Sequence, residues 1–211
     1  MEYLVTMTTH VPEGTPQEAV DDIRAREAAH SRGLAEAGLL LRLWRPPLEP
    51  GEWRTLGLFA APDAERLEEV LAAMPLRVWR SDEVTPLTPH PNDPGPDDPH
   101  PDDPGPTPAS TPTPAPGKEF LVTFAPDGPV SQALAAAAAA EAARAKELAR
   151  DGHLVRLWRT SADRALGLWR ARGAAELRTL LDSLPQAPWL TTTTTPLSEH
   201  PNDPALNPPR G

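Results

Sequence analysis

Residues 86–94 read PLTPHPNDP, and residues 196–204 read PLSEHPNDP. A second pair of segments matches in the same order, LRLWR at 41–45 and VRLWR at 155–159. Matches that keep their order along a chain are the sign of an internal repeat. We therefore interpret the chain of 211 residues as two copies of one unit.

The start of the unit repeats as well, with EYLVT at 2–6 and EFLVT at 119–123. Together the three matches predict one domain at 1–94 and a homologous domain at 118–204. We expect the remaining tail, 205–211, to be disordered.

Between the copies, residues 95–117 alternate Pro with Asp, Gly, Thr and Ser and contain no Lys or Arg. Such a segment has little apolar surface to bury and favours extended polyproline II geometry. At about 3.1 Å per residue it can span roughly 70 Å. We interpret it as a passive tether that is long enough for the two domains to pack on each other.

Each copy carries the same six elements in the order βαββαβ. Alternating β-prone residues mark the strands, and a capping box at Thr15–Glu18 and a stop at Gly38 mark the first helix. This order predicts a ferredoxin-like α+β unit with an antiparallel sheet. The expected strands are 2–9, 39–45, 53–60 and 77–87 in the first copy and 119–125, 153–159, 163–171 and 187–197 in the second; the expected helices are 15–37, 63–74, 129–150 and 174–184.

One such sheet leaves a face uncovered, and two copies in one chain suggest how it is covered. We expect the two ferredoxin-like domains to pair as an intramolecular dimeric α+β barrel. Assembly of the fused pair into a larger homo-oligomer stays open.

The composition excludes several classes of protein. A formal net charge of −10 argues against nucleic acid or an anionic membrane as the main partner. The absence of cysteine excludes a disulfide framework and a thiolate metal site. With no apolar run of membrane-spanning length and no evident signal peptide, we expect a cytoplasmic protein. Without phosphate-loop or metal-ligand spacing, we expect no cofactor.

The first helix carries a charge where its apolar stripe should continue. The stripe that begins at Val20 is interrupted by Glu27 and His30, and the second copy has Glu141 and Arg144 at the same points. A buried carboxylate must be paired or must take up a proton, and burial moves its pKa toward the range of acid/base catalysis. Glu27 and Glu141 are therefore our candidate catalytic residues, with a simple salt bridge as the alternative.

Other repeated side chains are candidates for binding a substrate. Strict alternation in 39–45 would put the odd-numbered residues, Arg45 included, on the face that meets the helices, within reach of Glu27. Arg159 repeats this beside Glu141, and such an arginine could stabilise an enolate or bind a carboxylate. His30 and Arg144, on the same helix face as the glutamates, are further candidates for binding a substrate. The remaining candidates are the repeated tail histidines His90 and His200, which could also be simple turn residues, and four tryptophans that could also be core: Trp44, Trp158, Trp79 and Trp189.

With these residues in place, each copy resembles muconolactone isomerase. The resemblance rests on the order of Glu27, Gly38, the LWR segment, Met74-Pro75-Leu76 and the closing HPND segment. It implies a ferredoxin-like fold and the cofactor-free migration of a double bond in an unsaturated lactone that bears a carboxymethyl group. One glutamate would act as base and then as acid, and the Trp-Arg pair would match the family's own pair.

The sequence departs from the family where an Asn-x-Ser element is usual. Those positions read Thr55-Leu56-Gly57 and Ala165-Leu166-Gly167. Fewer polar groups suit a larger and more apolar substrate, such as a polyketide-like one. We therefore keep three alternatives: an isomerase, a cyclase acting on a larger natural product, and a barrel that binds a small ligand without catalysis. If one copy is degenerate, the alanine-rich second copy is the one expected.

Overall fold

The computed structural model describes residues 1–95, 117–128 and 132–206. The tether predicted at 95–117 lies outside this part of the chain except for its terminal glycines. The tail predicted as disordered begins with an ordered turn, in which the amide of Ala205 donates to Asp203.

Contacts divide the chain into two units. Unit 1 contains Met1–Leu87 together with the chain from Leu197 onward, and unit 2 contains Thr88–Pro196. The unit boundaries therefore differ from the repeat boundaries, because the last segment of each copy belongs to the unit built on the other copy. The predicted packing of the two units on each other stays a prediction.

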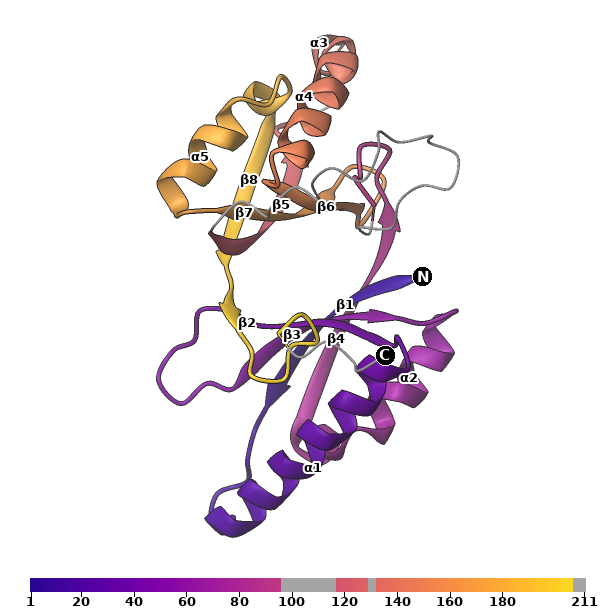
Figure 1. Ribbon diagram of the computed structural model, residues 1–211, viewed down its shortest axis with the longest axis vertical. Helices are drawn as coiled ribbons and strands as arrows, with labels where there is room; N and C mark the ends of the chain where they lie inside the picture. The colour runs from indigo at the N-terminus through magenta and orange to yellow at the C-terminus, as the bar shows by residue number, and fades with distance from the viewer. Residues whose placement is uncertain (96–116, 129–131, 207–211) are drawn as a thin grey trace, which may run out of the picture. The chain divides into compact units, whose positions relative to one another are not determined.

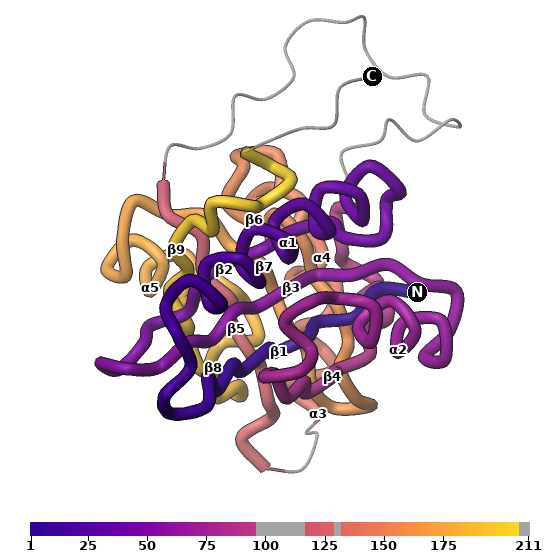
Figure 2. Tube along the Cα trace, turned by 90° about the horizontal axis from the view of Figure 1, so that it is seen from below, coloured from indigo at the N-terminus to yellow at the C-terminus, as the bar shows by residue number. Residues whose placement is uncertain are grey.

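Unit 1 is an antiparallel sheet with two α-helices on one face (Figures 1 and 2). Its strands lie in the order β4-β1-β3-β2-β9. The elements of unit 1 are β1 (Glu2–Thr9), α1 (Gln17–Glu36), β2 (Leu40–Arg45), β3 (Arg54–Ala60), α2 (Ala64–Ala73), the 3-10 helix η1 (Pro75–Trp79), β4 (Arg80–Pro89) and β9 (Ser198–Glu199).

Unit 2 repeats this plan, with strands in the order β8-β5-β7-β6 followed by the end of β4. Its elements are β5 (Lys118–Pro126), α3 (Gln132–Ala136), α4 (Ala138–Arg150), β6 (Leu154–Arg159), β7 (Ala165–Ala171), α5 (Ala174–Asp182), the 3-10 helix η2 (Ala187–Trp189) and β8 (Leu190–Pro196). The chain is thus α+β with two ferredoxin-like units, as the βαββαβ pattern predicted.

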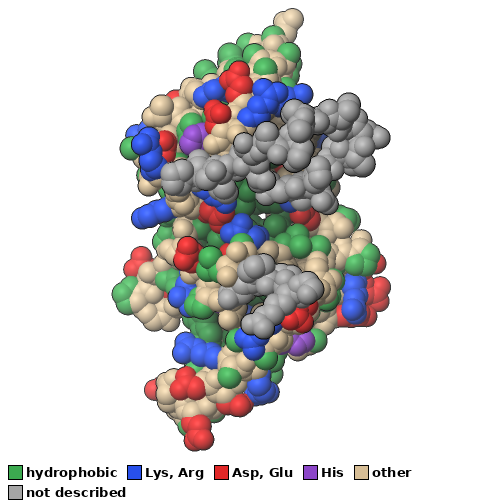
Figure 3. Space-filling model, viewed as in Figure 1, with side chains coloured by type: hydrophobic (Ala, Val, Ile, Leu, Met, Phe, Trp, Pro, Cys, Tyr) green, Lys and Arg blue, Asp and Glu red, His purple; other side chains and the backbone are tan. Residues whose placement is uncertain are grey.

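The core of each unit lies between the helices and the inner face of the sheet. In unit 1, Val5, Phe59 and Leu71 are fully buried there. Acidic and basic side chains lie side by side on the solvent face of α1 (Figure 3), where Arg26 bonds to Asp22 at 3.0 Å. The helix is therefore amphipathic, and its inner face holds the site described below.

The last segment of the second copy is fastened into unit 1. Strand β9 pairs with β2 through Glu199 and Trp44. The carboxylate of Asp203 then accepts the backbone N–H of Leu43 at 3.0 Å and forms an ion pair with Arg42 at 3.1 Å. A carboxylate that takes a charged and a backbone donor together holds the tail in one register.

The last segment of the first copy is fastened into unit 2 in the same way. Thr88 pairs with Arg159 of β6. Asp93 accepts the backbone N–H of Leu157 at 2.8 Å and forms an ion pair with Arg156 at 3.2 Å. The repeated HPND segment is thus a clamp on strand β2 or β6 of the other copy.

Three sequence expectations were wrong in detail. Helix α1 has Pro16 at its N-cap, and the Thr15 hydroxyl donates to Pro12 instead of closing a capping box. The second copy's first helix is broken at Ala137 into α3 and α4. The final strands begin later than expected, because η1 and η2 occupy their first residues.

The predicted alternation of strand 39–45 was also wrong. The pairing register shifts between Leu40 and Arg42, which is a β-bulge. A bulge inserts one unpaired residue, so Leu40 and Leu43 both face the core although their numbers differ by three. The same shift occurs in β6 between Leu154 and Arg156.

Candidate active site

Unit 1 holds a pocket of about 310 Å³ between α1, the sheet and η1. The tail residues 200–202 form part of its wall, so the second copy supplies one side of this pocket. Glu27 and Arg45, two of the predicted site residues, line it together with His200.

Glu27 is 8 % exposed and sits on the buried face of α1. Its Oε2 accepts the backbone N–H of Leu76 at 2.8 Å, and its Oε1 lies 3.2 Å from Nη1 of Arg80. The carboxylate is therefore paired within its own unit, which is the salt-bridge alternative left open by the sequence.

Arg80 is the partner that sequence reasoning missed. It is the first residue of β4, and its side chain is 2 % exposed. Its Nε and Nη2 also donate to Asp82 at 2.6 and 3.0 Å. Two carboxylates thus compensate one buried guanidinium, which is the arrangement that makes a buried charge tolerable. The signal in the sequence was an arginine and an aspartate two residues apart, on the same face of a strand.

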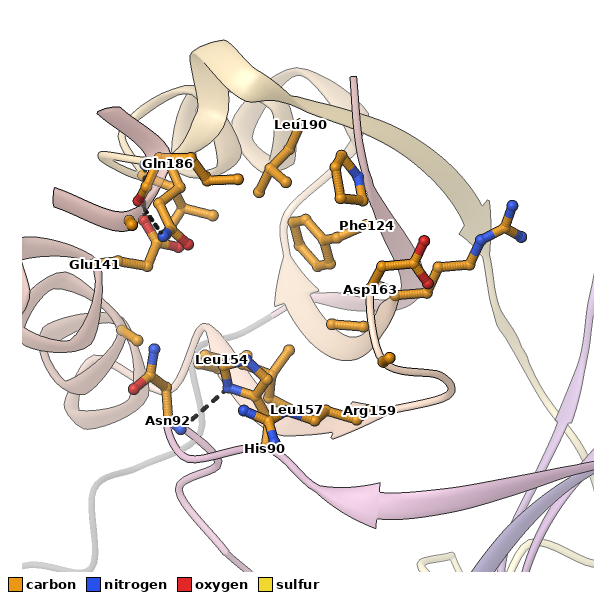
Figure 4. A pocket seen from close by; sticks show the side chains of 18 of the residues that line it. His90, Asn92, Phe124, Glu141, Leu154, Leu157, Arg159, Asp163, Gln186 and Leu190 are labelled. Carbon is orange, nitrogen blue, oxygen red and sulfur yellow. Dashed lines mark hydrogen bonds between the residues drawn. The ribbon is translucent and has the colours of Figure 1, made fainter. Parts of the chain in front are cut away.

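Unit 2 holds the corresponding pocket, of about 380 Å³ (Figure 4). Glu141 and Gln186 form one wall, and Phe124 and Leu190 line the far side. The tail residue His90 lies on the wall below them, so here the first copy supplies a side chain.

Glu141 accepts the backbone N–H of Gln186 at 2.9 Å through Oε2. Within the described residues it has no ion-pair partner. Burial raises the pKa of Glu141, and the hydrogen bond from Gln186 opposes that rise only in part. A carboxylate of this kind holds its proton more readily than a free one does.

The difference between the two glutamates traces to one position. Arg80 begins β4 and Leu190 begins β8, and each pairs with the last residue of the first strand of its sheet, Thr9 or Pro126. The guanidinium that pairs with Glu27 therefore has an isobutyl group as its counterpart in unit 2.

Each tail histidine accepts a backbone N–H through Nδ1, from Asn92 to His90 at 3.1 Å and from Asn202 to His200 at 3.2 Å. Burial and the nearby Arg45 lower the pKa of His200 to about 4, against the opposing effect of Asp203. Burial and Arg159 lower the pKa of His90, although Asp93 opposes this. At neutral pH both rings are uncharged, and the proton must reside on Nε2 because Nδ1 accepts.

Arg45 and Arg159 both line the pocket of their own unit. Both are exposed, and in the described part of the chain neither guanidinium is paired with a carboxylate. Each pocket thus presents an unpaired cation and an uncharged imidazole, which suits a ligand that carries a carboxylate and a carbonyl.

The remaining predicted site residues do not line either pocket. Trp44 and Trp158 are buried, and each stacks under an arginine, Arg42 or Arg156, with 4.8 Å between guanidinium and ring centre. Trp79, Trp189, His30 and Arg144 also lie outside the linings of the two pockets. The Nε2 atom of His30 is buried and has no hydrogen-bond partner in the described residues. Arg144 bonds to Ser183 and Glu147.

Within residues 1–95, 117–128 and 132–206, no group of three or more His, Asp or Glu side chains is placed to hold a metal ion. In the same residues, every helix is too short or too polar to cross a membrane.

Comparison with known proteins finds one family twice in the chain. The family model for muconolactone delta-isomerase matches residues 1–93 and again residues 119–203. Muconolactone Delta-isomerase 1 of Acinetobacter lwoffii is 34% identical over 92 residues, which are 44% of this chain and 93% of that protein. The muconolactone Delta-isomerase of Cupriavidus pinatubonensis is also 34% identical over 92 residues, 44% of this chain and 97% of that protein. Each relative therefore corresponds to one copy.

Among solved structures, a heme-binding protein from Thermus thermophilus aligns with a TM-score of 0.58 and 12% identity. The alignment covers 96% of this chain and 93% of that one. At this identity the likeness bears on the fold alone, and it agrees with two α+β units in one chain.

Proposed function

This chain belongs to the muconolactone delta-isomerase family, represented in it twice, and from that premise we propose that it moves a double bond in an unsaturated lactone or a related enolisable substrate. We propose Glu141 as the carboxylate that carries the proton and unit 2 as the active unit. The observation that carries this proposal is a half-buried glutamate without an ion pair in the described residues, in a pocket with apolar walls.

The reaction needs one group that removes a proton and returns it at a different carbon. The Glu141 carboxylate would take the proton from a carbon conjugated to the lactone carbonyl, which leaves a dienolate and a carboxylic acid. The same acid would then protonate the other end of the dienolate. A raised pKa supports both steps, because the carboxyl group must accept and release the proton at similar cost.

Two neighbouring side chains supply the charge and the hydrogen bond that a dienolate needs. Arg159 would pair with the substrate carboxylate or with the developing oxyanion. His90, uncharged and protonated on Nε2, would donate to the lactone carbonyl oxygen. No step in this sequence requires a cofactor, so we propose a cofactor-free reaction.

Glu27 is the second carboxylate that we proposed from sequence. Its ion pair with Arg80 and the hydrogen bond that it accepts from Leu76 hold this carboxylate against its own unit, so we propose a structural role for Glu27 and not the role of the base. We also propose 1–94 and 118–204 as the two repeated domains. The last segment of each copy belongs to the unit built on the other copy, so neither copy forms a complete unit by itself.

The apolar wall of the unit 2 pocket favours a larger substrate than muconolactone as the alternative. This wall offers few hydrogen-bonding groups to a small polar ring, because it is formed by Phe124, Leu154 and Leu190. A cyclase or isomerase acting on a polyketide-like substrate would use the same glutamate in the same way.

The test is proton NMR of the full chain with muconolactone in deuterated water. We expect double-bond migration, or deuterium entering the substrate, in the wild type. Glu141→Gln should lower the rate by about 100-fold or more, in the range of a lost general acid/base. Glu27→Gln is the matched control and should lower it by less than about 3-fold, a small effect for a residue outside the reacting site.

Two outcomes would count against the proposal. A rate that depends on Glu27 and not on Glu141 would move the active site to unit 1. No exchange with muconolactone or with a larger aryl-substituted butenolide would leave a protein that binds without catalysing.

A further inference from the structure

We propose that the pocket of unit 1 is a separate binding site for a small hydroxylated carboxylate, so that the two pockets of the chain take different ligands. The proposal concerns unit 1 alone and does not depend on turnover in unit 2.

The first observation is a pair of hydroxyl groups, carried by two largely buried residues, that face the pocket. Ser31 is 3 % exposed and Thr9 is 7 % exposed, and both line the pocket. Within the described residues, neither hydroxyl makes a hydrogen bond. Neither hydroxyl belongs to the fully buried polar atoms that lack a partner, so both are accessible from the pocket, where they can bond to a ligand.

The second observation is that the whole hydroxyl set is particular to unit 1. Thr55 adds a third hydroxyl to the lining of the pocket. The equivalent residues of unit 2 line its pocket too, but none of them has a hydroxyl group: Pro126 for Thr9, Ala145 for Ser31, and Ala165 for Thr55.

The third observation is the charge that the pocket presents. Arg45, without an ion pair in the described residues, is a cation that can take a carboxylate. The Glu27 carboxylate is buried, is fixed by Leu76 and Arg80, and can accept a hydrogen bond from a ligand hydroxyl. An anion that also carries hydroxyl groups satisfies both side chains, whereas an apolar acid satisfies only one.

The pocket also offers a stacking surface. Arg24 lies over the ring of Trp53 at 4.3 Å, and both line the pocket. A flat, unsaturated ring fits beside such a surface better than a flexible chain does. We therefore expect a cyclic or unsaturated hydroxycarboxylate.

The experiment compares two ligands of one carbon skeleton by isothermal titration calorimetry on the full chain. Shikimate and cyclohex-1-ene-1-carboxylate share a ring and a carboxylate, and only shikimate has ring hydroxyls. We expect shikimate to bind at least about 10-fold more tightly, as one or two net hydrogen bonds would give. Ser31→Ala should weaken shikimate by about 3- to 10-fold, the effect of one lost hydrogen bond, and should change the other ligand by less than about 2-fold.

A pair of arginine variants assigns the binding to a unit. Arg45→Ala should weaken shikimate by more than about 10-fold, because a charge-assisted contact is lost. Arg159→Ala, its counterpart in unit 2, should change the affinity by less than about 2-fold, because it lies outside the proposed site. Circular dichroism and a thermal melt of each variant would show that the fold is kept.

Three results would overturn the proposal: no binding of shikimate, equal loss for both ligands in Ser31→Ala, or equal loss in Arg45→Ala and Arg159→Ala. Glu141→Gln separates this test from that of the proposed isomerase, because it should abolish proton exchange and leave shikimate binding unchanged.

Discussion

Unit 1 and unit 2 each place a glutamate on the inner face of the first helix, but Glu27 pairs with a guanidinium and Glu141 shares its pocket with a leucine at the equivalent position. The backbone around the two is alike, since each carboxylate accepts the N–H of an equivalent residue, Leu76 or Gln186. One side chain at the start of the last strand therefore decides whether the carboxylate has a buried guanidinium beside it.

The comparison shows that the position of the glutamate side chain and the charge around it are determined by different parts of the sequence. Duplication of a fold reproduces where a side chain lies, because helix, sheet and tail clamp are repeated together. It does not reproduce the charge around that side chain, which depends on single positions such as Arg80 and Leu190. The two pockets can thus diverge in chemistry while the units keep one architecture.

The largest expected effect is on stability in unit 1. Arg80→Leu copies unit 2, leaves the buried Glu27 without its cation and leaves Asp82 with Arg77 alone. We expect a loss of about 3–5 kcal/mol in the free energy of unfolding, the usual cost of breaking a buried ion pair from one side. Urea unfolding would measure it, with hydrogen exchange of α1 peptides to assign it to unit 1.

A matched variant checks the cause. Adding Glu27→Gln to Arg80→Leu removes the uncompensated charge and should recover much of the loss. If Arg80→Leu alone costs less than about 1 kcal/mol, which is the range of an exposed pair, the ion pair does not distinguish the two units.

The second effect is on proton exchange in unit 2. Leu190→Arg copies unit 1 and should bring a cation to Glu141, lowering the pKa of that carboxyl and weakening it as a base. We expect the deuterium exchange rate to fall by about 100-fold, with Leu190→Met as the control that keeps an apolar group. An unchanged rate in the arginine variant would mean that the charge beside Glu141 does not matter.

The third effect tests the HPND segments, each of which belongs to one copy and binds to the unit built on the other. Asp93→Ala removes the clamp on Leu157 and Arg156 and should displace His90 from the unit 2 pocket, at a cost of about 2 kcal/mol. Asp203→Ala does the same to unit 1. We expect only Asp93→Ala to slow proton exchange, although it lies in the first copy. Equal slowing in both variants would contradict the assignment of each tail to the opposite unit.

The fold was largely predictable because its signals are local and occur twice. Strand alternation, helix periodicity and the repeated HPND segment all predict a tandem βαββαβ chain. The bulges in β2 and β6 were not predictable; in β2, Leu39 to Leu41 offer three leucines with no polar residue to fix the register.

The site was predictable only in part. Glu27 and Glu141 stand out because a charge interrupts an apolar stripe, but Arg80 and Leu190 lie about fifty residues further along the chain, and only the fold brings them close. The sequence also favoured the second copy as the degenerate one because of its alanine run. The raised pKa of Glu141 supports the opposite ranking, since alanines around a carboxylate leave it fewer polar partners.

The smallest expected effect is on the melting temperature, which should shift in opposite directions when Glu141 and Glu27 are each replaced by glutamine. Burial raises the pKa of Glu141 above its ordinary value of 4.5, so its contribution to stability is fully present below pH 4.5 and is lost as the pH rises through the folded-state pKa. Glu141→Gln should therefore melt at a higher temperature than the wild type at neutral pH and at the same temperature at low pH. Glu27→Gln should melt lower at neutral pH, because it removes a carboxylate that Arg80 pairs with. Calorimetric melts of both variants at several pH values would measure this, and equal signs at neutral pH would show that the two carboxylates are electrostatically equivalent after all.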